Sequence, residues 1–159
     1  MTARKMILTM ALISIPALLL AADDAWMGTW KLNLAKTKPT EGKPPQSFIQ
    51  KYEPNGTGGF KSTADLVRDD GVAEHVEYSA NFDGKQYPRN NDRPASGRIV
   101  LKRIDDHTFE TETYRPGETA AGVTTHHVVS KDGKTMAVTA KGVNTRGQAF
   151  ENVSIYERQ

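Results

Sequence analysis

Cysteine is absent from this chain of 159 residues. Without it there can be no disulfide bond and no thioether-linked lipid, so a disulfide-stapled scaffold and a bacterial lipoprotein are both excluded. The fold must therefore be held by noncovalent contacts. A chain of this length can bury a hydrophobic core large enough to stabilise the fold without disulfide bonds.

Long hydrophobic runs are nearly absent as well, with one exception over residues 6–20. This run is shorter than the ~20 apolar residues of a membrane-spanning helix. Arg4 and Lys5 precede it, and the small residues Ala21-Ala22 follow. The layout predicts a secretory signal over residues 1–22 and a mature domain over residues 23–159, exported to the periplasm or secreted. An uncleaved anchor is the alternative, because the cleavage site departs from the A-x-A pattern.

The chain also lacks a large excess of charge of either sign. It has 21 Lys and Arg against 19 Asp and Glu, and loss of Arg4 and Lys5 with the signal would make the two equal. A balanced domain has no basic surface excess to attract nucleic acid or an anionic membrane. We expect no nucleic-acid partner and no stable membrane insertion of the mature domain.

No segment after the signal shows a helical stripe of apolar residues, whereas period-two alternation is frequent. Val76, Tyr78, Ala80 and Phe82, for example, share one face of an expected strand. Hairpin dipeptides separate such segments, at 55–56, 83–84 and 132–133, where Asn or Asp precedes Gly. Strands are predicted over residues 28–34, 47–53, 59–67, 74–82, 98–104, 107–115, 123–130, 135–141 and 149–157, with an irregular polar stretch over 88–97.

Short strands joined by tight turns predict an all-β fold, a single antiparallel up-and-down β-barrel of about 8–10 strands. Closure is favoured because open hydrophobic edges invite aggregation. A sandwich with Greek-key crossings is the alternative, and it would need longer connections than most of these.

Several segments of the chain carry a family resemblance, beginning with the first expected strand. Gly28-Thr29-Trp30 is a Gly-x-Trp motif on the first expected strand, and Lys31–Lys36 continues it. This opening resembles that of lipocalins and related calycin barrels, and more closely that of small secreted bacterial proteins described as lipocalin-like. The similarity continues through segments at 83–88, 101–105, 129–136 and 153–157, and so covers nearly the whole mature domain.

The resemblance implies a lipocalin-like barrel that binds a small ligand and whose first-strand tryptophan packs at the closed end. It also implies a late arginine lying across that indole. Arg158 is the positional match for this arginine, and Arg146 is a poorer one. A guanidinium over an indole contributes roughly 0.5–2 kcal/mol, so Trp30 and Arg158 are the expected closure of the barrel base.

Catalytic and metal-binding patterns are lacking. There is no nucleophile elbow, no cysteine nucleophile, and no glycine-rich loop before a helix. His126-His127 would point to opposite faces of a strand, and no third ligand follows at a suitable spacing. We therefore expect no metal, no cofactor and no catalytic residue. A barrel enzyme using Glu110, Glu112 or His127 is the weakest of three functional hypotheses.

Aromatic residues remain as the strongest lead, because they occur on nearly every expected strand. If one face of each strand points inward, they meet in the barrel interior, where they either pack a solid core or line an apolar pocket. The sequence predicts a non-enzymatic barrel binding a small apolar ligand. A filled barrel with an interaction role in the cell envelope is the alternative, and an interior cavity of at least ~300 Å³ would distinguish them. The expected interior site is Trp30, Tyr52, Phe60, Tyr78, Phe82 and His127.

Overall fold

The computed structural model describes residues 24–39, 42–91, 97–144 and 146–159. It is a closed, all-antiparallel barrel, as predicted. Its strands are β1 (Gly28–Leu32), β2 (Ser47–Pro54), β3 (Gly59–Val67), β4 (Ala73–Asn81), β5 (Tyr87–Asn91), β6 (Gly97–Arg103), β7 (Thr108–Tyr114), β8 (Val123–Val129), β9 (Thr135–Val143) and β10 (Ala149–Arg158). The predicted secretory signal over residues 1–22 lies outside the described residues.

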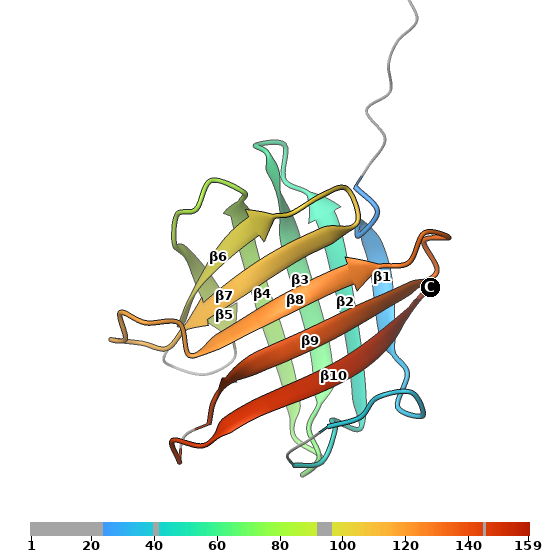
Figure 1. Ribbon diagram of the computed structural model, residues 1–159, viewed down its shortest axis with the longest axis vertical. Helices are drawn as coiled ribbons and strands as arrows, with labels where there is room; N and C mark the ends of the chain where they lie inside the picture. The colour runs from blue at the N-terminus through green and yellow to red at the C-terminus, as the bar shows by residue number, and fades with distance from the viewer. Residues whose placement is uncertain (1–23, 40–41, 92–96, 145) are drawn as a thin grey trace, which may run out of the picture.

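Each strand pairs with the next along the chain, and the last returns to the first (Figure 1). The closing pair places Trp30 of β1 opposite Arg158 of β10. On its other edge β1 pairs with β2, where Gly28 lies opposite Tyr52. This connectivity is an up-and-down barrel, so no crossover interrupts the sheet.

The stretch over 88–97 was expected to be irregular, and that expectation was wrong for part of it. β5 pairs Tyr78 of β4 with Arg89, and Tyr87 with Ile99 of β6. Pro88 cannot donate a ladder hydrogen bond, and the flanking residues are polar, so local preference does not favour a strand here. The strand forms because the edges of β4 and β6 need a partner between them for the sheet to close.

The two ends of the barrel differ in their connections. Turns at one end join β2 to β3, β4 to β5, β6 to β7 and β8 to β9. In these turns an Asn or Asp side-chain oxygen accepts the backbone N–H two residues later, at 2.8–3.1 Å; the four residues are Asn55, Asp83, Asp105 and Asp132. Such side chains replace a backbone partner in a tight turn. This end, which also carries residues 24–27, is called the closed end.

The closed end is filled by packed aromatic rings. Phe109 lies at its centre, with ring centroids 5.1 Å from Trp26, 5.6 Å from Tyr52 and 5.4 Å from Phe60. Most of these pairs meet edge to face or tilted, which is the favoured geometry for aromatic rings. Trp26, Tyr52, Phe60 and Phe109 are at most 1% exposed, so this half of the interior is a solid core.

The described residues form strands and no helix. They therefore include no helix long and apolar enough to span a membrane. The opposite end is where β1, β3, β5, β7 and β9 end and where β2, β4, β6, β8 and β10 begin. It is called the open end, because the interior behind it is hollow.

Candidate functional site

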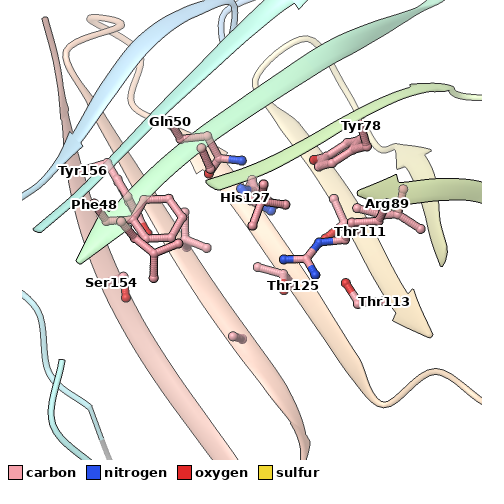
Figure 2. Close-up of a pocket in the computed structure, with 16 residues that line it drawn as sticks. Phe48, Gln50, Tyr78, Arg89, Thr111, Thr113, Thr125, His127, Ser154 and Tyr156 are labelled. Atoms are coloured by element: carbon pink, nitrogen blue, oxygen red, sulfur yellow. The ribbon is translucent and has the colours of Figure 1, made fainter. Parts of the chain in front are cut away.

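A cavity of about 240 Å³ occupies the barrel interior beside the aromatic core. Its walls come from nearly all the strands, because inward-facing positions alternate along each of them. Apolar side chains form much of the lining, namely Phe48, Leu66, Val76, Ile99, Val138 and Tyr156. Figure 2 shows Phe48 and Tyr156 on one side of this space and Arg89 on the other. We call it the inner chamber.

A second hollow of about 310 Å³ adjoins the inner chamber toward the open end. The two share four lining residues, Phe48, Leu66, Ser154 and Tyr156. Lys43 and Pro45, from the connection between β1 and β2, line the outer hollow only. The outer hollow is therefore a vestibule, through which a small molecule can reach the chamber.

Phe48 and Tyr156 stand where the chamber and the vestibule meet. Their ring centroids are 5.7 Å apart, with the planes at 79°. Phe48 is partly buried and Tyr156 is 7% exposed. Burial raises the pKa of the Tyr156 phenol, so it stays neutral throughout the physiological range.

His127 forms part of the chamber floor, against the aromatic core. Its ring stacks on Phe109 at a centroid distance of 4.2 Å and an interplanar angle of 9°. Burial, with a smaller contribution from His126, lowers the pKa of His127 to about 3. The imidazole is therefore neutral at physiological pH, and its Nδ1 is buried without a hydrogen-bond partner among the described residues.

Neutral polar groups complete one wall of the chamber. The Gln50 amide donates to the Ser62 hydroxyl at 3.0 Å. Burial raises the pKa of Tyr78 to about 12, against the opposing effect of its hydrogen bond with Ser62. Thr111, Thr113 and Thr125 add hydroxyl groups from β7 and β8. The lining thus offers donors and acceptors without a nucleophile–base pair.

Among the described residues of this lining, one side chain is charged, that of Arg89 on β5. Figure 2 shows its guanidinium directed away from its own strand into the chamber. Sequence patterns gave no reason to single out Arg89, because it falls in the stretch expected to be irregular. A strand prediction there would have placed it on the inward face opposite Tyr78.

The six residues expected to form the interior site fall into two groups. Tyr78 and His127 line the inner chamber. Trp30, Tyr52, Phe60 and Phe82 belong to the packed core or lie against it, and they do not line the chamber. Tyr52 nonetheless approaches the chamber floor, with its ring 6.4 Å from that of His127. Its hydroxyl is buried and unpartnered among the described residues.

Trp30 and Arg158 meet at the closed end. The Arg158 Cζ atom lies 4.3 Å from the centroid of the Trp30 ring, which is fully buried. Arg158 also donates to the carbonyl oxygens of Ala25, of Met27 at 2.5 Å and of Gly133 at 2.6 Å. These bonds tie the last strand to the N-terminal segment and to one closed-end turn. Arg146, the poorer match, lies in the turn between β9 and β10 at the open end.

Gly28 makes room for this arginine. Its φ is +116°, and a Cβ atom there would lie 2.7 Å from Nη1 of Arg158. A side chain at position 28 would therefore be strained and would displace the guanidinium. Both residues of the Gly-x-Trp motif thus contribute to the contact with Arg158: Trp30 provides the ring, and Gly28 leaves space for the guanidinium.

The other candidate acids and histidines lie on the outer face. Glu110 is 3.7 Å from His126, and Glu112 pairs with Lys102. Neither glutamate lines the chamber, and none of the described residues that line it beside His127 is a carboxylate. Across the described part of the chain, no three His, Asp or Glu side chains gather as a metal site would require.

Comparison with known proteins does not assign the chain to a family. No protein-family model matches the chain, and no curated protein matches it. The site must therefore be interpreted from its own geometry.

Proposed function

We propose that this chain is an exported, non-enzymatic β-barrel that binds a small, largely apolar molecule in its interior. The observation that carries the proposal is the inner chamber. One half of the barrel is packed solid with aromatic rings, whereas the other half leaves a cavity of about 240 Å³ with a vestibule outside it. Concave, mostly apolar spaces with a few polar groups are typical ligand sites.

The sequence resemblance to lipocalin-like proteins supports the same function, since a Gly-x-Trp first strand and a late arginine accompany ligand-binding barrels. The signal-like segment over residues 1–22 supports a place of action in the periplasm or outside the cell. The chamber chemistry favours binding over catalysis, because a neutral histidine, hydroxyl groups and apolar walls include no activated nucleophile.

A filled barrel that acts through its outer surface is the second candidate. It is favoured by the size of the inner chamber, which falls below the ~300 Å³ at which pockets for drug-sized ligands begin. The vestibule weighs against this candidate because it extends the accessible space. A ligand that fits the inner chamber is therefore small.

Native mass spectrometry tests the proposal directly. The protein would be purified from the periplasm or medium of its own host and sprayed under non-denaturing conditions. We expect a discrete mass increment that is lost on denaturation and returns when the extracted small molecule is added back. A spectrum showing the bare chain alone, with no uptake of added octanoate or octanol, would favour the filled barrel.

A further inference from the structure

The described lining of the chamber contains a positive charge and no negative charge. Among the described residues that line it, Arg89 is the one cation, and none is a carboxylate. The charge of Glu74 acts on Arg89 from outside the lining, and the Glu74 carboxylate is 3.2 Å from Arg68 in an ion pair. Burial lowers the pKa of the Arg89 guanidinium from its usual value. A partly buried cation without a paired anion costs folding free energy.

The side chains around Arg89 differ between its own side of the chamber and the facing side. Thr111, Thr113 and Thr125 lie on its side of the chamber, whereas Phe48 and Tyr156 lie across from it (Figure 2). Hydroxyl groups can donate to an anion that the guanidinium binds, and the aromatic side can take an apolar body. The chamber therefore carries a cation and hydroxyl groups on one side, and two aromatic rings with the polar side chains of Gln50 and Ser154 on the other.

The type of anion follows from the charge and shape of the site. A guanidinium presents two parallel N–H groups that match the two oxygens of a carboxylate. A phosphate monoester carries about −1.5 to −2 charges at neutral pH, and a single cation would leave part of that charge buried and unpaired. One cation with neutral hydroxyl groups fits a monoanion.

We propose that Arg89 binds the carboxylate of a small amphipathic acid whose apolar part lies against Phe48 and Tyr156. This inference rests on the proposed function and adds the chemical class of the ligand. The acid enters through the vestibule, whose lining includes the cations Lys43 and Arg68 together with Asp69.

Isothermal titration with a matched pair of probes, octanoate and 1-octanol, tests the inference, since the two differ only in the charged head. We expect wild-type protein to bind octanoate more tightly than octanol by about 10- to 100-fold, the usual contribution of a charge-assisted hydrogen-bonded pair. In Arg89→Met, octanoate binding should fall by a similar factor while octanol binding stays within about threefold. The Arg89→Lys protein should fall between the two, because it keeps the charge and loses the bidentate geometry.

Arg98→Met is the matched control, because Arg98 lies exposed on neighbouring β6 and bonds the Glu118 carbonyl outside the chamber. It should leave both affinities unchanged. Urea unfolding without ligand gives an independent readout: Arg89→Met should be as stable as wild type or more so, since the variant removes an unpaired charge. A clear loss of stability would overturn the inference by showing a structural role.

The outcomes separate the inference from the proposed function. Equal binding of octanoate and octanol, unaffected by Arg89→Met, would overturn the carboxylate site while leaving an apolar-ligand barrel in place. Failure of wild-type protein to bind either probe would overturn both. Loss of octanoate alone in Arg89→Met supports both.

Discussion

The Arg158 guanidinium lies over the Trp30 indole, with its Cζ atom 4.3 Å from the ring centroid, although the two residues belong to the last and first strands. The contact covers a fully buried ring at the point where the barrel closes. The same guanidinium also bonds three backbone carbonyl groups. A single side chain therefore joins the seam, the N-terminal segment and a closed-end turn.

Replacing Trp30 should remove much of the closed-end packing. We expect Trp30→Ala to lower the free energy of unfolding by about 3–5 kcal/mol, because a large buried ring leaves a cavity. Urea titration followed by circular dichroism measures this loss. Thr29→Ala, the adjacent position on the opposite face of β1, is the control and should cost far less. A loss below about 1 kcal/mol in Trp30→Ala would contradict the placement of the ring.

Gly28 and Arg158 should be energetically coupled. Gly28→Ala introduces strain at positive φ and pushes the guanidinium away, whereas Arg158→Met removes its cation–π contact and hydrogen bonds. Each variant should lose about 1–2 kcal/mol of stability. The double variant should lose less than the sum, because part of the cost of the alanine is displacement of the arginine. Strict additivity in denaturant titrations would show that the two residues act separately.

His127 should make stability depend on pH. The folded protein keeps this imidazole neutral down to a pKa of about 3, whereas the unfolded chain protonates it near pH 6.5. The unfolded state thus binds more protons between these values, and the contribution of His127 to stability falls by about 1.4 kcal/mol per pH unit as pH drops through this window.

The measurement is the difference in unfolding free energy between wild type and His127→Gln, taken at several pH values from 7 to 4. Contributions from other titrating groups are common to both proteins and cancel. We expect the difference to shift in favour of the glutamine variant as pH falls. A constant difference across the series would refute a buried neutral histidine.

Filling the inner chamber should abolish binding while sparing the fold. Ala140 lines the chamber, whereas Thr139 points to the outer face of β9. We expect Ala140→Leu to lose the native mass increment and to weaken uptake of added octanoate at least tenfold. The matched variant Thr139→Leu should retain both. Full retention of ligand by the Ala140→Leu protein would place the binding site elsewhere.

The fold class could be predicted because turn chemistry and alternation agree along most of the chain. Asn55, Asp83 and Asp132 each precede a glycine, and each lies in a closed-end turn of the structure. β5 was not predicted because it forms a strand only through its pairing with β4 and β6. Apart from Tyr87, its residues have little strand preference of their own. The need for a strand between β4 and β6 arises only once the sheet curves into a barrel.

The candidate site could be predicted less well for a related reason. Alternation shows which residues face inward, but not how far along the barrel axis each lies. Phe60 and Tyr78 both point inward, yet Tyr78 reaches the chamber and Phe60 packs in the solid half. Arg89 could not be chosen without knowing that β5 exists. The volume of the inner chamber depends on the combined sizes of side chains from many strands. A local sequence pattern does not contain that information.

Pairing between β1 and β10 has a consequence for how the chain reaches its folded form. Residues 149–158 must be made before the sheet can close, so a chain stopped short of them would present unsatisfied edges on β1 and β9. Incomplete chains of this protein are therefore expected to self-associate, and folding should be slow for the chain's length because its first and last segments must meet. Protection of these two edges therefore depends on residues 149–158, which pair with both strands.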